Sequence, residues 1–285
     1  MYKISIEPEE IEKMPLTAFG GEIKVIDKPG WEFIKAVEYL KRRKILGFDT
    51  ESRPSFSPRH HNGGVALLQL SDDKKAFLFR VNTLGMRKGL CTILGSKRIL
   101  KVGAAVSDDV HGLQRVYPFK AQSFVDLQDI VNDYGIRDKS VKKMSAIILG
   151  YKISKAQQLS NWEATTLTEA QCKYAATDAW ICREMYLKLM ASEKHPLSPE
   201  ERIPPRQLAE QQAAAERRAQ NRKAMEEENR RRHEEAVKRK EKRRQEAMER
   251  QKLEHEAAVE RRRNNPRPKK YYHRKPKPAE SVDNG

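Results

Sequence analysis

The chain contains 285 residues with 57 Lys and Arg against 40 Asp and Glu, and the excess is basic both in residues 1–198 (31 against 23) and in residues 199–285 (26 against 17). This charge favours a polyanionic partner such as nucleic acid, although a basic chain can also be merely soluble. The absence of an 18-residue apolar run, a signal-peptide core and a paired cysteine spacing argues against a membrane or disulfide-stapled protein and predicts a cytoplasmic location.

The first elements are predicted to be a helix and a set of strands. An edge strand is expected at residues 22–27, and apolar side chains at helical spacing predict a helix over residues 31–43. A strand follows at 44–50, and two β-rich runs at 65–70 and 76–81 enclose a polar turn typical of a hairpin. Three successive strands of this kind indicate an antiparallel meander.

From residue 85 onward the pattern alternates between helix and strand. Helices are predicted at 86–95, 107–116, 128–134 and 139–149, and strands are predicted at 99–104 and 124–127. A meander followed by such an alternation indicates an α/β fold, in which a mixed sheet carries helices on both faces.

Residues 168–190 form the clearest helix of the sequence. Thr168 and Gln171 make a capping box, because the pattern Ser/Thr-x-x-Glu/Gln satisfies two unpaired backbone donors at a helix start. The inward stripe of this helix contains Tyr174, Asp178, Ile181, Met185 and Leu189. An aspartate in an apolar stripe is costly to bury, so it needs a cation or several hydrogen-bond donors beside it.

The composition changes after Ser198. Residues 206–263 lack Gly and Pro and show no heptad period, so a solvated charged helix or a partly disordered arm is expected there rather than a coiled coil. Residues 266–278 mix basic and aromatic side chains with four prolines, which suits phosphate contact with base stacking or a solubilising tail. We therefore divide the chain into a folded domain (1–198), a charged helical extension (199–263) and a basic disordered tail (264–285).

Acidic side chains stand at the ends of predicted elements. Asp49 and Glu51 end the strand at 44–50, and strand alternation points both to one face. Two like charges this close are unfavourable unless a cation lies between them, so the pair predicts a divalent-metal site. Asp109 is the third candidate, because it shares a helical row with apolar residues whereas Asp108 faces solvent. A simple helix cap is the alternative for Asp109.

Tyr174 and Asp178 lie one turn apart on one helix face. Tyr134 and Asp138 have the same spacing, but Gly135 interrupts that pair and we discount it. In combination, these residues resemble the motifs of the DEDDy 3′–5′ exonucleases, the RNase D and Werner-type group of the RNase H-like superfamily. The match covers about residues 20–192 and excludes the charged arm. It is carried by the stretches 47–51, 65–70, 102–106 with Asp109, 160–162, 167–171 and 174–179.

The resemblance implies an RNase H-like fold and hydrolysis of DNA or RNA from the 3′ end to 5′-mononucleotides with two divalent cations, Mg²⁺ or Mn²⁺. Asp49 would bridge the two ions, while Glu51 and Asp178 would complete the site that activates water. Asp109 would reach the second ion, and Tyr174 would orient the attacking water. Four carboxylates suit such hard cations, which prefer oxygen ligands.

Three further residues are candidates for substrate contacts. Arg53 is expected to hold a phosphate or to form a surface ion pair, and His111 to stack on a base or to be a simple exposed histidine. Trp162 is expected to stack on a base or to fill the core. The C-terminal arm is expected to tether nucleic acid or a ribonucleoprotein.

Two other functions remain open. One is a catalytically inert nucleic-acid-binding or scaffold protein with an exonuclease-like domain. The other is an RNase H-like endonuclease or transposase, against which the Tyr-x-x-x-Asp helix argues.

Overall fold

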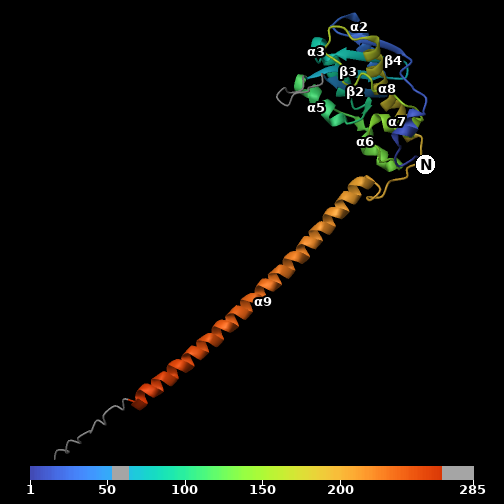
Figure 1. The fold of residues 1–285 in the computed structure, drawn as a ribbon. Helices are drawn as coiled ribbons and strands as arrows, with labels where there is room; N and C mark the ends of the chain where they lie inside the picture. The colour runs from blue at the N-terminus through green and yellow to red at the C-terminus, as the bar shows by residue number, and fades with distance from the viewer. Residues whose placement is uncertain (53–63, 265–285) are drawn as a thin grey trace, which may run out of the picture. The chain divides into compact units, whose positions relative to one another are not determined.

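A mixed six-stranded sheet forms the centre of the described structure. The computed structural model describes residues 1–52 and 64–264, and the strand order is β1-β4-β3-β2-β5-β6. The strands are β1 (Glu22–Ile26), β2 (Ile45–Ser52), β3 (Val65–Ser71), β4 (Lys75–Arg80), β5 (Leu100–Gly103) and β6 (Phe124–Asp126). The run β2-β3-β4 is antiparallel, whereas β1, β5 and β6 join it in parallel. The predicted meander and mixed sheet are therefore confirmed (Figure 1).

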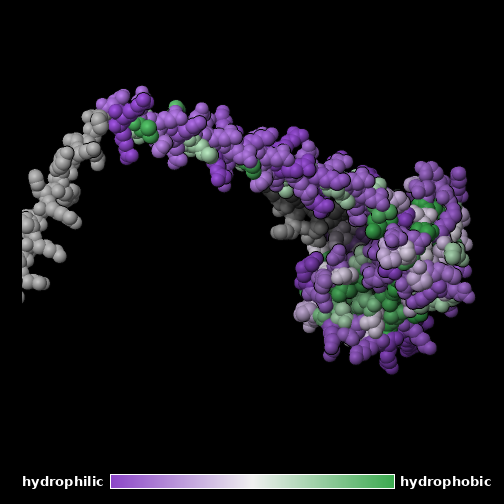
Figure 2. All heavy atoms as spheres, turned by 90° about the horizontal axis from the view of Figure 1, so that it is seen from below, coloured by the Kyte–Doolittle hydropathy of each residue, from purple (hydrophilic) through white to green (hydrophobic). Residues whose placement is uncertain are grey.

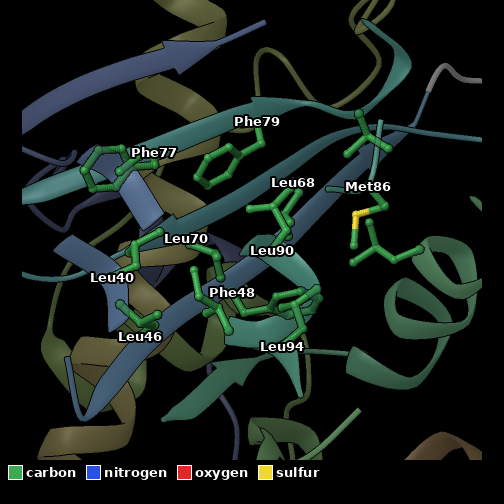
Figure 3. Packing of buried hydrophobic residues seen from close by; sticks show 14 of the residues in the cluster. Leu40, Leu46, Phe48, Leu68, Leu70, Phe77, Phe79, Met86, Leu90 and Leu94 are labelled. Atoms are coloured by element: carbon green, nitrogen blue, oxygen red, sulfur yellow. The ribbon is translucent and has the colours of Figure 1, made fainter. Parts of the chain in front are cut away.

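One face of the sheet carries a large apolar cluster. Strand alternation sends every second side chain to this face, where Phe48, Leu68 and Phe79 pack with Leu40 and Leu90 (Figure 3). Burial of each Leu or Phe side chain stabilises the fold by roughly 1.5–3 kcal/mol. The helices that contribute to this cluster are α2 (Trp31–Lys41), α3 (Val81–Leu84), α4 (Lys88–Leu94) and α5 (Val106–Val116).

The opposite face is covered by α8 (Glu169–Met190) together with α7 (Val141–Leu149). The predicted capping box of α8 is confirmed, since the Thr168 hydroxyl accepts a hydrogen bond from the Gln171 N–H and the Gln171 side chain accepts one from the Thr168 N–H. Helices on both faces of a mixed sheet agree with the α/β, RNase H-like class expected from the sequence.

Two local details differ from the sequence prediction. The helix predicted at 128–134 is divided into α6 (Leu127–Ile130) and a 3₁₀ turn, η1 (Val131–Tyr134), which ends at Gly135 with a left-handed φ of 81°. A short helix, α1 (Pro8–Glu12), was not predicted, because a single turn is too short to show periodicity.

The C-terminal part of the chain forms a single long helix, α9 (Pro205–Asn264). By its internal contacts the chain divides into Met1–Gln207 and the part from Leu208 onward. At 1.5 Å per residue, α9 is roughly 90 Å long. None of its residues is buried, and Figure 2 shows a hydrophilic surface along it with isolated apolar spots. Of the two alternatives for residues 206–263, the structure has the helix.

Ion pairs between successive turns accompany this exposed helix. Arg231 pairs with Glu227 at 2.9 Å, and Arg232 pairs with Glu228 at 2.6 Å, each at an i,i+4 spacing. Exposed pairs of this kind contribute only about 0.3–0.5 kcal/mol each. No described helix combines the length and the apolarity that crossing a bilayer requires.

Candidate active site

The C-terminal end of β2 supplies the first two carboxylates. Asp49 and Glu51 are two residues apart on this strand, so their side chains leave the same face of the sheet. In the antiparallel register with β3, Asp49 lies opposite Gln69 and Glu51 opposite Leu67. The register shifts between Glu51 and Ser52, so regular pairing ends just beyond the two acids.

The third carboxylate comes from α8, which crosses β2 in very close contact. A Cβ atom built on Gly47 would overlap the carbonyl oxygen of Ala179 and lie 2.6 Å from its carbonyl carbon. Only glycine therefore permits this approach of helix to strand. The approach places Asp178 beside the β2 acids, and ligand oxygens of Asp49, Glu51 and Asp178 lie within 4.8 Å of one another.

The electrostatics of this carboxylate triad, Asp49, Glu51 and Asp178, favour a bound cation. Burial raises the pKa of Asp49 well above its usual range, and the neighbouring carboxylates raise it further. Burial, with the charge of Asp178, also raises the pKa of Glu51 to about 9. Anions are therefore unfavourable here until positive charge is placed among them. An all-oxygen donor set of this kind fits hard divalent cations such as Mg²⁺ and Mn²⁺.

Asp109 lies near the triad but slightly apart from it. It is not among the three residues whose ligand atoms converge, yet its charge contributes to the raised pKa values of Asp49 and Glu51. The Thr50 hydroxyl donates a hydrogen bond of 2.5 Å to Asp109. Burial raises the pKa of Asp109 to about 6, while this hydrogen bond acts in the opposite direction.

The start of α5, which carries Asp109, is held by the side chain of Asp126. The Asp126 carboxylate accepts hydrogen bonds from the N–H groups of Ala105 (3.1 Å) and Val106 (2.9 Å). Ala105 has a left-handed φ of 56°, which is unfavourable for a residue with a side chain. One signal was present in the sequence, because an Asp between a strand and a helix is a common N-cap.

Tyr174 lies one turn before Asp178 and is partly buried. Burial raises the pKa of Asp178 to about 6, and the neighbouring Tyr174 phenol acts in the opposite direction by favouring the charged carboxylate. The Tyr174 ring packs against the Trp162 indole, with centroids 6.0 Å apart. Its phenol is thus fixed at the edge of the triad.

A cleft of about 310 Å³ opens onto these residues. Its wall includes Cys182 and Lys155, whose charge lowers the pKa of Asp178. Other lining residues are Asp49, Thr50, Glu51, Ala104, Ala105, Gln128, Ser140, Val141, Ile153, Gln158, Tyr174 and Asp178. The triad and Tyr174 are therefore reachable by a ligand.

The remaining candidates occupy other places. His111 is exposed on α5 and lines a separate hollow beside β6. Trp162 has no exposed surface and belongs to the core, so the structure gives no face on which a base could stack. Arg53 lies outside the described residues.

The discounted pair, Tyr134 and Asp138, has a structural role. Tyr134 is buried in the core, and the Asp138 carboxylate accepts hydrogen bonds from the Ser5 hydroxyl and the Ile6 N–H. This pair takes no part in the cleft described above.

Comparison with known proteins identifies relatives of the folded part. A family model described as 3′–5′ exonuclease matches residues 31–192. The mouse bifunctional 3′–5′ exonuclease/ATP-dependent helicase WRN is 33% identical over 151 residues, which are 51% of this chain and 11% of that protein. The Drosophila melanogaster exonuclease 3′–5′ domain-containing protein 2 is 32% identical over 163 residues, 56% of this chain and 27% of that protein. The chain thus spans only a small part of either relative.

A solved structure supports the fold. The Trypanosoma brucei RNase D in complex with RNA U12 superposes with a TM-score of 0.55 and 20% sequence identity, covering 61% of this chain and 64% of that one. At this identity the likeness concerns the fold alone.

Proposed function

The chain belongs to the 3′–5′ exonuclease family, and from this premise we propose that it removes nucleotides one at a time from the 3′ end of DNA or RNA. The reaction is hydrolysis of the terminal phosphodiester bond, and its product is a 5′-mononucleotide. The catalytic part lies in residues 1–198, and residues 199–285 form an appended arm.

The convergence of Asp49, Glu51 and Asp178 within 4.8 Å carries this proposal. Three desolvated acids in one cleft destabilise a protein unless they bind positive charge. Two divalent cations, when bound, would supply an activated water and relieve the charge on the leaving oxygen. Asp49 would serve both ions, because its carboxyl feels the charges of Asp178, Glu51 and Asp109.

The other residues of the site have separate tasks. Glu51 and Asp178 would hold, with Asp49, the ion that activates the attacking water. Asp109 would contribute to holding the second ion, which agrees with its place just outside the converging group. Tyr174 would orient the attacking water through a hydrogen bond of its phenol, from the position that its ring contact with Trp162 fixes.

Substrate phosphate is attracted by the positive charge near the cleft. Lys155 lines the cleft and is exposed, so its ammonium group is free to meet a phosphate oxygen. The arm adds a sequence-independent contact with nucleic acid or a ribonucleoprotein, because the 205–264 helix presents exposed Lys and Arg side chains throughout.

A product analysis on full-length protein tests the proposed function. DNA and RNA oligonucleotides labelled at the 5′ end are incubated with Mg²⁺, Mn²⁺ or EDTA, and products are separated by length. Stepwise shortening that requires metal, and that Asp49→Asn abolishes without loss of the folded state, supports the proposal. If the oligonucleotides remain at full length after exhaustive incubation with each metal, the protein is an inert, binding-only member of the family. Cleavage of a circular substrate would identify an endonuclease.

A further inference from the structure

Gln69 is a polar residue in an unusual position. It lies in the middle of β3 with none of its surface exposed, and neither its amide oxygen nor its amide nitrogen has a hydrogen-bond partner. A buried amide without partners lowers stability, because the hydrogen bonds that it makes with water in the unfolded chain are not replaced. Such a residue calls for an explanation beyond packing.

The register of the sheet places Gln69 directly opposite Asp49. The same antiparallel pairing sets Ser71 opposite Gly47, and Ser71 Oγ lies 3.0 Å from a Cβ built on Gly47. Gly47, Asp49, Gln69 and Ser71 therefore point to one face, the face that α8 covers. Cross-strand neighbours have Cβ atoms roughly 4.5–5.5 Å apart, so the Gln69 amide is within reach of the Asp49 carboxylate.

The neighbours of Gln69 along β3 and across on β4 are apolar. Leu68 and Leu70, which flank Gln69 in sequence, fill the apolar cluster on the opposite face (Figure 3). On its own face Gln69 lies across from Leu78 of β4, which packs with Ala175 and Ala176 of α8. An apolar side chain of equal length would satisfy this environment better than glutamine does.

We propose that Gln69 is the positioning residue for Asp49, and that its amide N–H donates a hydrogen bond to the Asp49 carboxylate when cations are bound. The inference rests on the proposed function, because Asp49 needs to be held in one orientation only where it serves as a cation ligand. A neutral amide suits this task. It orients the carboxylate without competing for it as an ion pair with Lys or Arg would.

A positioning residue can be distinguished from a structural one by the stability of the metal-free protein. A structural amide stabilises the fold without metal, whereas the Gln69 amide has no hydrogen-bond partner in the metal-free structure. Removing the hydrogen-bond partner of a metal ligand typically lowers metal affinity by about 10- to 100-fold. The loss should therefore show in metal binding and not in the stability of the metal-free protein.

The test uses full-length Gln69→Met, which keeps the length of the side chain and removes the amide. Isothermal titration with Mn²⁺ should show affinity lower by about tenfold or more, and the Tm in EDTA should be unchanged or higher. In oligonucleotide assays at saturating substrate, kcat should fall while KM changes little. Ser71→Ala is the matched control. This substitution removes the unpartnered buried hydroxyl on the same face of β3. Because Ser71 lies opposite Gly47 and not opposite a metal ligand, Mn²⁺ affinity should be unchanged.

The outcomes separate this inference from the proposed function. Wild-type Mn²⁺ affinity in Gln69→Met overturns the role of Gln69, even where the wild-type protein binds metal and degrades oligonucleotides. A wild-type protein that binds no Mn²⁺ overturns the proposed function itself. A Tm in EDTA that falls by many degrees in both Gln69→Met and Gln69→Leu shows that the amide is paired in the metal-free fold, and this also overturns the inference.

Discussion

Gly47 of β2 lies directly beneath the Ala179 carbonyl of α8, with no space for a Cβ atom between them. This contact sets how near the helix that carries Asp178 comes to the strand that carries Asp49. A β-carbon at position 47 must therefore move α8 outward and separate the triad, because neither backbone can yield without breaking its own hydrogen bonds.

We expect Gly47→Ala to lower the free energy of unfolding by about 1–3 kcal/mol, the usual cost of overpacking, and to abolish most nuclease activity. Urea denaturation and an oligonucleotide assay measure the two effects. Gly20→Ala is the control, since nothing lies within 4 Å of a Cβ at that position. Equal activity in the two variants would show that the distance between α8 and β2 has no bearing on the site.

Thr50→Val should raise the pKa of Asp109. The Thr50 hydroxyl stabilises the charged form of this carboxyl by donating a hydrogen bond of 2.5 Å, and valine keeps the shape without the donor. Hydrogen bonds to charged groups contribute about 1.5–3 kcal/mol. We expect kcat/KM at neutral pH to fall by about tenfold or more, with the acid limb of the pH–rate profile moving to higher pH. Thr50→Ser keeps the donor and should restore both. A profile that does not move in the valine variant contradicts this role.

The metal-free protein should become less stable as the pH rises. The folded-state pKa of Glu51 is about 9 and those of Asp109 and Asp178 are about 6, all above the value near 4 of the unfolded chain. The folded protein therefore retains protons that the unfolded chain has already released, and this contribution is complete below about pH 4 and is lost as the pH passes each folded value.

Calorimetry in EDTA should accordingly record a falling Tm between about pH 5 and pH 9. Excess Mn²⁺ should diminish the fall, because bound cations replace the protons. Glu51→Gln should remove the part of the decline at the alkaline end. A Tm in EDTA that is constant over this range would mean that the triad is not desolvated in solution.

Tyr174→Phe should reduce kcat by about 10²-fold, because the phenol orients the attacking water. Tyr134→Phe is a strict control, as this tyrosine has the same spacing to a downstream aspartate but is buried in the core. Single-turnover kinetics isolates the chemical step. An undiminished rate in Tyr174→Phe would remove this residue from the mechanism.

Neutralising Lys238, Arg239 and Lys240 with glutamine should weaken binding of single strands. Each lost phosphate contact lowers the slope of log affinity against log salt by about 0.7, and kcat at saturating substrate should not change. Glu226, Glu227 and Glu228 provide a control of the same size and opposite charge, and their replacement by glutamine should strengthen binding. Fluorescence anisotropy at several salt concentrations measures the slope. Identical slopes in all three proteins would assign the arm another role.

The amino-acid pattern was sufficient to predict the sheet, most of the helices and which acidic side chains share a face. Asp49 with Glu51 and Tyr174 with Asp178 follow the short periods of strand and helix, so their shared faces could be inferred from spacing alone. The long helix at 206–263 also followed from composition, although order and disorder could not be separated there, because exposed charged helices and disordered arms have similar compositions.

Other features depend on contacts between distant segments and carry no local signal. Gly47 looks like any strand glycine until Ala179 is placed on it. Gln69 looks like a solvent-facing residue of a strand until α8 covers it, and Asp126 looks like an ordinary polar residue until it caps α5 as well as α6. Trp162 remained ambiguous for the same reason, since only packing against Tyr174 shows that its indole is enclosed.

The unbroken helix α9 sets a minimum separation between whatever its two ends hold. A flexible chain of 60 residues has a root-mean-square span of roughly 40–45 Å, whereas the helix keeps its ends roughly 90 Å apart. A nucleic-acid strand bound at the last turn of α9 would thus lie about 26 base pairs of duplex length away from the first turn of this helix. If the arm binds nucleic acid as proposed, it acts as a rigid spacer and not as a flexible tether, and a strand shorter than the helix cannot contact both of its ends.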